Sequence, residues 1–219
     1  MEEVFPQVVF TIFGLPVRDT VISTWVTMAI IIGVAWAVRR SLPTALEMLI
    51  EFLRSQLVDI MGGMNVDPYI PYLGALVIFL MIANNIGIVP LVSTPTKDIN
   101  TTAALAVTVL FAVHLFGMQK KGLLGYLKEM ATPLVILDII SDLSRTLSLS
   151  LRLFGNIIAG EIIVAVIYRL VQPVVPLPMI ALSMVTGVLQ AYIFMILATS
   201  AIASAVRSEG DRAEAGPKR

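Results

Sequence analysis

Two charged side chains interrupt one of the most apolar stretches of this sequence. The segment LSLSLRLFGNIIAGE, residues 147–161, places Arg152 among Leu and Phe and puts Glu161 nine residues later. An arginine at mid-membrane costs about 2.5–3.5 kcal/mol on insertion scales. A carboxylate three or four residues away on the same helix would offset this cost, but those four positions hold two small residues, a leucine and an asparagine. We therefore expect Arg152 to meet a carboxylate on another element, or water.

More polar residues share the face of Arg152 if this segment is helical. At about 100° per residue, five strongly polar side chains fall within an arc of roughly 80°. These five are Asp138, Asp142, Arg145, Arg152 and Asn156, with Ser141, Ser144 and Ser148 on one flank. A salt bridge between Asp142 and Arg145, three residues apart, is a purely structural interpretation of part of this face. Glu161 falls about 180° from Arg152, which suggests an aqueous path and not a pair.

Two other apolar stretches carry amides. Ser183, Gly187 and Gln190 lie on one face of the last apolar segment, and Asn84 lies deep in an earlier one. Gln190 could donate a hydrogen bond to a neighbouring helix near Arg152 or Asn156. The alternative is that it only holds two helices together.

The composition places these polar residues in a membrane. Of the 219 residues, 58% are hydrophobic and 14% are charged, whereas soluble domains have about 45–50% and about 25%. Fifteen basic residues balance fifteen acidic ones, so no basic field predicts nucleic-acid binding. The absence of cysteine and the single histidine exclude thiolate and multi-histidine metal sites. We expect an all-α polytopic membrane protein without a cofactor.

The apolar segments predict one integral membrane domain over residues 1–219. The expected elements are three roughly perpendicular spans, an interfacial helix, two long helices and a disordered cytoplasmic tail. Their ranges are 21–38, 69–89 and 99–118 for the spans, 42–61 for the interfacial helix, 134–171 and 179–206 for the long helices, and 208–219 for the tail. Lysines and arginines concentrate on one side of this arrangement, which predicts an external N-terminus and a cytoplasmic C-terminus.

The long helices are too long to stand upright. At about 1.5 Å per residue, residues 134–171 would extend roughly 57 Å, against about 30 Å for the hydrocarbon core of a bilayer. We expect the two helices to form a strongly tilted hairpin. Such a hairpin would leave one long side available to a large partner.

The segments SLSLRLFGNIIAGE and LQAYIFMILAT resemble subunit a of the F-type rotary ATP synthase, the membrane stator subunit of a rotary motor. IGIVP and PTKDINTT extend the resemblance over most of the chain. It implies a non-catalytic subunit that passes protons through two half-channels at the interface with the c-ring, coupling the ion gradient to rotation and ATP synthesis. The implied partners are the c-ring, subunit b of the peripheral stalk and the rest of the complex. The implied location is the plasma (inner) membrane of a bacterium.

The resemblance also implies roles for individual residues. Arg152 matches the essential stator arginine that faces the c-ring carboxylates, with Gln190 and Asn156 beside it. Glu161 matches the carboxylate of one half-channel, and Asn84 matches a polar residue of an access path. The other ion-pathway candidates are Asp138, Asp142, Ser144, Arg145 and Ser148. At Ser183 some relatives carry histidine, so here Glu161, serine and water must serve in its place.

Two other functions fit the sequence less well. A secondary transporter would show internal repeats and spans broken at matching positions, and neither is present in the sequence. A membrane scaffold that transports nothing would leave Arg152 without a purpose. A sodium-coupled version of the same subunit remains open, because the ion ligands sit mainly on the c subunit.

Overall fold

The computed structural model of the chain describes residues 6–12, 14–89, 92–122, 125–126, 135–170 and 176–207. Within these ranges the protein is mostly helical, which confirms the predicted all-α membrane class. The helices are α1 (Asp19–Ser41), α2 (Pro43–Met61), α3 (Ile70–Asn85), α4 (Ile99–Lys121), α6 (Val135–Leu170) and α7 (Pro176–Val206), with short 3-10 turns η2 (Ile86–Ile88) and η3 (Pro95–Lys97).

Five of these helices are long and apolar enough to cross a membrane: α1, α3 with η2, α4, α6 and α7. Helix α2 is the exception, consistent with the expectation that it does not span. Its charged residues Glu47, Glu51, Arg54 and Asp59 are spread along an otherwise apolar helix. It ends at Met61 and is capped by Gly62, whose φ of 68° suits a residue without a Cβ.

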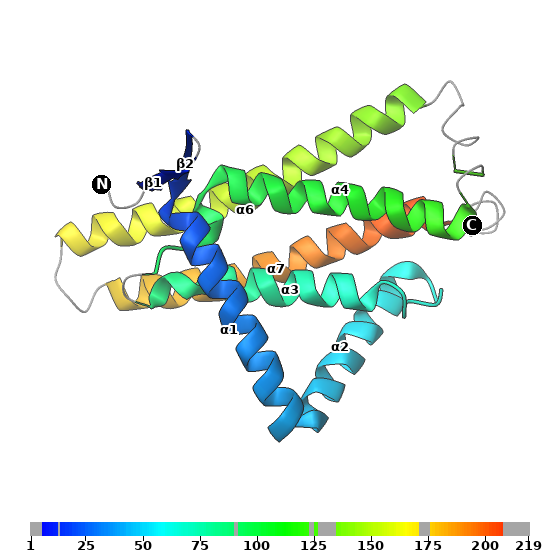
Figure 1. Cartoon of the computed structure of the whole chain (residues 1–219), viewed down its shortest axis with the longest axis horizontal. Coiled ribbons are helices and arrows are strands. Elements are labelled where there is room, and N and C mark those ends of the chain that lie inside the picture. The colour runs from blue at the N-terminus through cyan, green and yellow to red at the C-terminus, as the bar shows by residue number, and fades with distance from the viewer. Residues whose placement is uncertain are drawn as a thin grey trace.

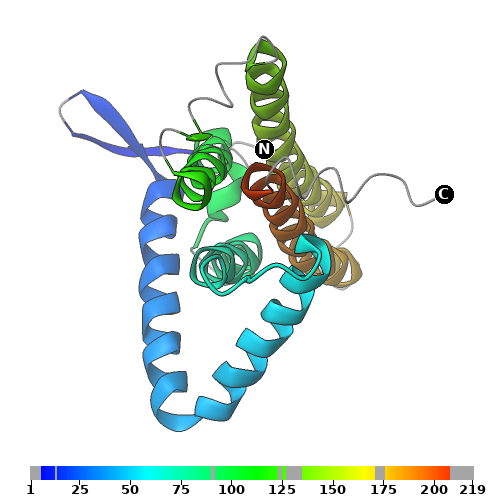
Figure 2. The ribbon, with the colours of Figure 1, turned by 90° about the vertical axis from the view of Figure 1, so that its right-hand side faces the viewer.

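Four helices run side by side, and α1 crosses them (Figure 1). Helix α3 packs on α7, α4 packs on both α6 and α7, and α6 packs on α7. Turned by 90°, the same view shows α1 and α2 as the two arms of a V, with α2 returning to the bundle (Figure 2). Because α3 and α4 lie alongside the α6–α7 hairpin, any tilt of the hairpin in a bilayer is shared by them.

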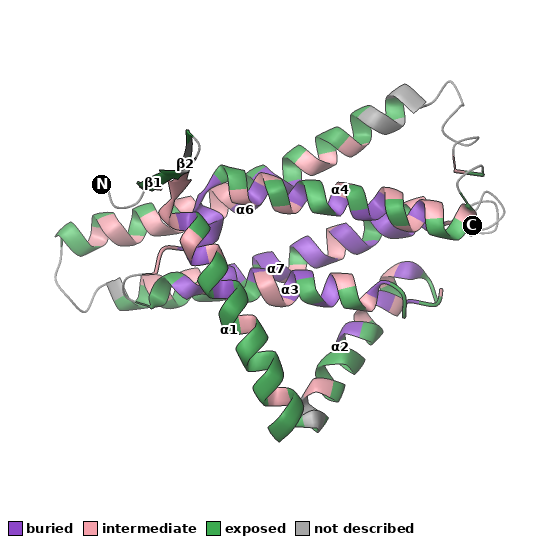
Figure 3. Ribbon diagram, in the orientation of Figure 1, coloured by how far each residue is buried: buried purple, intermediate pink, exposed green. Residues whose placement is uncertain are grey.

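The core lies where these four helices meet and where the end of α2 reaches them (Figure 3). Leu73 and Leu80 of α3, Leu153 of α6, and Phe194 and Met195 of α7 have no exposed surface. Helix α1 has the opposite distribution. Its buried residues are all polar, namely Thr20, Ser23 and Thr27, while apolar side chains cover its outside. An apolar exterior around a polar inner strip is what a lipid-facing helix requires.

Two features of the fold differ from the sequence prediction. A small antiparallel hairpin, β1 (Val8–Ile12) with β2 (Leu15–Arg18), precedes α1 and was not expected. Helix α7 begins at Pro176, three residues before the predicted start, because the first turn of a helix has amide groups without internal partners and so tolerates proline. The predicted tail, residues 208–219, lies outside the described residues.

Candidate functional site

A cavity of about 500 Å³ lies between α3, the η3 segment, α6 and α7. Its wall carries several polar side chains that are far apart in the sequence. Among them are Asn84, Asn85, Lys97, Glu161, Arg169 and Ser183. Three of these, Asn84, Glu161 and Ser183, were predicted as ion-pathway residues from the sequence, and the structure brings them to one cavity.

Glu161 is half-buried on the side of α6 that faces α7 and η3. It interacts with Thr94 and lies within the electrostatic reach of Lys97 and Asp19. On the neighbouring position of α6, Gly160 lets α7 come close, because a Cβ there would lie 3.0 Å from Ser183 Oγ. The missing side chain keeps both the carboxylate and the serine hydroxyl at the cavity.

Asn84 is buried in the wall between α3 and α7, and both ends of its amide are used. Its Nδ2 donates to the carbonyl oxygen of Gly187 over 2.9 Å, and its Oδ1 accepts from Thr96 Oγ1 over 2.9 Å. Gly187 makes this approach possible, since a Cβ there would lie 3.2 Å from the Cβ of Asn84. Asn84 therefore fixes three elements around the cavity: α3, η3 and α7.

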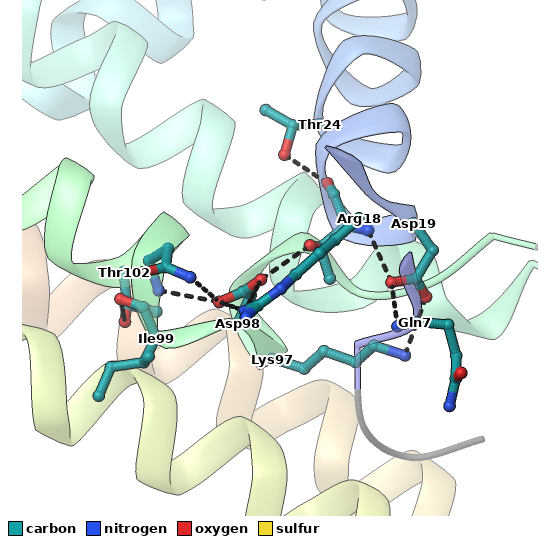
Figure 4. Close-up of polar contacts among 10 residues, drawn as sticks. Gln7, Arg18, Asp19, Thr24, Lys97, Asp98, Ile99 and Thr102 are labelled. Carbon is teal, nitrogen blue, oxygen red and sulfur yellow. Dashed lines mark hydrogen bonds and ion pairs between the residues drawn. The ribbon is translucent and has the colours of Figure 1, made fainter. Parts of the chain in front are cut away.

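Two crossed ion pairs join the start of α1 to the segment around η3, and one of their four residues, Lys97, also lines the cavity (Figure 4). Arg18 donates two hydrogen bonds to Asp98, at 3.1 and 3.0 Å, and Lys97 Nζ lies 3.5 Å from Asp19 Oδ2. The adjacent residues 18 and 19 thus pair with the adjacent residues 98 and 97. Lys97 and Asp98 are each only 3% exposed. Charged side chains are buried to this extent almost only when they are paired.

Asp98 also begins α4. Its Oδ1 accepts the backbone N–H of Asn100 at 2.9 Å, the bond of an N-terminal helix cap. Thr20 donates to its other oxygen over 3.1 Å. Burial alone would raise the pKa of Asp98, but the hydrogen bonds from Asn100, Arg18 and Thr20 and the charge of Arg18 outweigh it, so this pKa is lowered.

Arg152 lies on a different side of α6 and is exposed. Small residues line one flank of its face: Ser144, Ser148 and Ala159 are exposed, and a Cβ at Gly155 would meet nothing within 4 Å. Leu147 and Leu151 are exposed beside them. The buried face of the helix, with Leu149, Leu153 and Ile157, separates this exposed face from Glu161. This agrees with the placement of Arg152 and Glu161 on different faces.

The remaining candidates are distributed as follows. Arg145 Nη1 lies 3.9 Å from Asp142, at the limit of an ion pair, so the structural interpretation holds weakly for these two residues. Asn156 is half-buried and Gln190 is buried in the core. Between described residues, no hydrogen bond joins Gln190 to Arg152 or Asn156. Asp138 belongs to α6, but its side chain lies outside the described part of the structure.

Sequence reasoning missed Lys97, which lines the cavity, and Asp19, which pairs with it. In the sequence Lys97 looks like an ordinary loop charge, because no local pattern links it to a residue 78 positions earlier. Among the residues that the structure describes, no group of three or more His, Cys, Asp or Glu side chains is placed to hold a metal.

Comparison with known proteins gives one consistent result. Residues 21–202 match the family described as ATP synthase A chain. ATP synthase subunit a 2 of Bradyrhizobium sp. (strain BTAi1 / ATCC BAA-1182) is 41% identical over 209 residues, which cover 91% of this chain and 93% of the relative. ATP synthase subunit a 2 of Acaryochloris marina is 38% identical over 91% of this chain and 90% of the relative. ATP synthase subunit a of Moorella thermoacetica is 34% identical over 94% and 99%.

Proposed function

We propose that this chain carries protons along two separate half-channels at its interface with the c-ring. The gradient is thereby coupled to rotation and to ATP synthesis. The chain belongs to the ATP synthase A chain family, whose members are the non-catalytic, ion-translocating membrane subunits of ATP synthase. The observation that carries this proposal is the position of Glu161 in a polar cavity while Arg152 lies exposed on another face of the same helix.

The cavity is one half-channel. Its hydroxyl, amide and carboxylate groups can hold water and relay a proton between the outside and the c-ring. Glu161 is the titrating group of this path, and Ser183 with water completes it where some relatives have histidine. The second half-channel, on the opposite side of the membrane, includes Asp138, Ser144 and Ser148 toward the cytoplasmic end of α6.

Arg152 separates the two paths. The c-ring brings a carboxylate to its exposed face, and the guanidinium holds that carboxylate ionised until it reaches the next half-channel. Arginine suits this task because its pKa above about 12 keeps it charged at low dielectric. The small residues beside it leave room for a close-fitting partner helix. Asn156 shares the face of Arg152, and Gln190 on α7 is the other residue that we propose to assist the arginine once the c-ring is in place.

The orientation is inferred from the charge distribution, and the ion pairs are compatible with it because they hold both proposed external segments at the same end of the bundle. The segments expected outside, ahead of α1 and between α3 and α4, are held together by Arg18–Asp98 and Lys97–Asp19 at one end of the bundle. This supports an external N-terminus and a cytoplasmic C-terminus in a bacterial plasma membrane.

The test uses the assembled complex in membrane vesicles. Arg152→Ala and Arg152→Lys are expected to abolish ATP synthesis driven by an ion gradient, since lysine lacks the delocalised, permanently charged group. Coupled synthesis at the normal rate in either variant would contradict the proposal. Glu161→Gln is expected to slow ion conduction while the complex still assembles, and unchanged conduction would remove Glu161 from the path. Comparing ATP synthesis driven by a proton gradient with ATP synthesis driven by a sodium gradient decides between the two ions.

A further inference from the structure

Lys97 is a buried cation that the proposed mechanism does not use. Its side chain is 4% exposed. Among the described residues, its ammonium has two polar partners: Asp19 Oδ2 at 3.5 Å and Ser93 Oγ at 3.2 Å. An ammonium has three N–H donors. The third is free to serve the cavity, whose wall Lys97 shares with Glu161.

The two ion pairs Arg18–Asp98 and Lys97–Asp19, together called the clamp, differ in a way that bears on function. Arg18 holds Asp98 through two short hydrogen bonds and has no part in the cavity wall. Lys97 holds Asp19 at a longer distance and does line the cavity. Holding the two segments together requires only a pair like Arg18–Asp98, which stays outside the cavity. The second pair joins a flexible cation to Asp19 while the same cation lines the cavity of Glu161, where the two charges interact.

Glu161 needs such a cation whenever it has released its ion. A bare carboxylate in a partly buried site is costly unless an opposite charge lies near it. Arg152 cannot supply that charge, because it lies on another face of α6. Arg169 also lines the cavity, but it is exposed, so water screens its charge more than that of the buried Lys97. The four-carbon stem of lysine lets its ammonium move by an ångström or more without backbone change.

We propose that Lys97 is the counterion of the Glu161 half-channel, drawn toward Glu161 when that carboxylate is empty and toward Asp19 when it is loaded. This inference rests on the proposed role of Glu161 in ion conduction. No bond is formed or broken in it: the ammonium keeps its protons, and only its distance to the two carboxylates changes.

The experiment measures passive ion conduction through the membrane sector of the assembled complex in vesicles, driven by a potassium diffusion potential. Lys97→Met keeps the length of the side chain and removes its charge. It is expected to lower conduction at least about tenfold, in line with the loss of one hydrogen bond to a charged group. Lys97→Arg keeps a cation and is expected to restore most of the rate. The matched control is Arg18→Gln, which breaks the other pair of the same clamp and is expected to conduct normally.

A double variant separates the two functions of the lysine. In Asp19→Asn/Lys97→Met the clamp pair is replaced by two neutral groups, so no buried charge is left unpaired. Conduction that stays low supports the counterion role, and recovery to the normal rate overturns it. Equal loss in Lys97→Met and Arg18→Gln also overturns it, because both effects would then come from the clamp. If Glu161→Gln is defective and Lys97→Met is normal, only this inference fails; if Glu161→Gln is normal, the proposed path itself fails.

Discussion

The side-chain amide of Asn84 donates to the carbonyl oxygen of Gly187 over 2.9 Å, and this bond joins α3 to α7 in the wall of the cavity. A backbone carbonyl inside a helix normally accepts only from its own helix. Here a second donor reaches it because Gly187 carries no side chain. The cavity therefore depends on a close contact between two backbones as well as on its polar side chains.

Enlarging Gly187 should separate these helices. In Gly187→Val the new side chain would meet Asn84 and Asn85, where even a Cβ has neighbours at 3.2 Å. We expect a loss of about 1–3 kcal/mol, the usual cost of overpacking, seen as a lower melting temperature of the purified subunit in detergent. Gly33→Val on α1 is the matched control, because a Cβ there meets nothing within 4 Å. Equal melting temperatures for both variants would contradict the close contact.

Gly160 should control the width of the cavity. In Gly160→Ala the added methyl lies 3.0 Å from Ser183 Oγ, and a small rotation of the serine accommodates it. Gly160→Leu instead fills the space between Glu161 and Ser183. We expect conduction in vesicles to fall in the order glycine, alanine, leucine, while assembly of the complex is unchanged. A leucine variant that conducts like the original would show that ions do not pass this point.

We expect Gly155 to affect the contact with the c-ring and not the stability of the isolated subunit. Because open space surrounds its Cβ position, Gly155→Leu is expected to leave the melting temperature of the isolated subunit unchanged. The same side chain would project from the exposed face beside Arg152, where the c-ring is proposed to lie. We expect weaker assembly or slower coupled ATP synthesis in the complete complex. Normal assembly and synthesis would place the c-ring elsewhere.

The ion pair between Arg18 and Asp98 should weaken in acid. The pKa of Asp98 is lowered, so its carboxylate stabilises the fold above the unfolded value of about 3.9 and loses this effect as the pH falls through the folded value. We expect the melting temperature to drop below about pH 4 by more in the original protein than in Asp98→Asn. Asparagine also caps helices, so the comparison isolates the charge. Parallel pH curves for the two proteins would refute this contribution.

The helices of this fold can be predicted from local sequence patterns, but the residues that meet at the cavity and its ion pairs cannot. Runs of apolar residues predicted the helices to within a few positions, and a turn of 100° per residue separated Glu161 from the face of Arg152. By contrast, Lys97 and Asp98 look like ordinary loop charges in the sequence. Their burial depends on Arg18 and Asp19, about 80 residues earlier, and no periodicity connects such positions. The β1–β2 hairpin was missed for a related reason, since five- and four-residue strands carry little pattern of their own.

The crossed pairs also set an order for making the protein. Arg18 and Asp19 leave the ribosome first, and their partners follow about 80 residues later, which at roughly 5–20 residues per second is a delay of about 4–16 seconds. During that interval Arg18 lacks its ion-pair partner, and Asp19 has only its local partners, the backbone N–H groups of Gln7 and Thr20. The two ion pairs therefore form only after η3 has been made, and Lys97 reaches its place beside the cavity at the same stage.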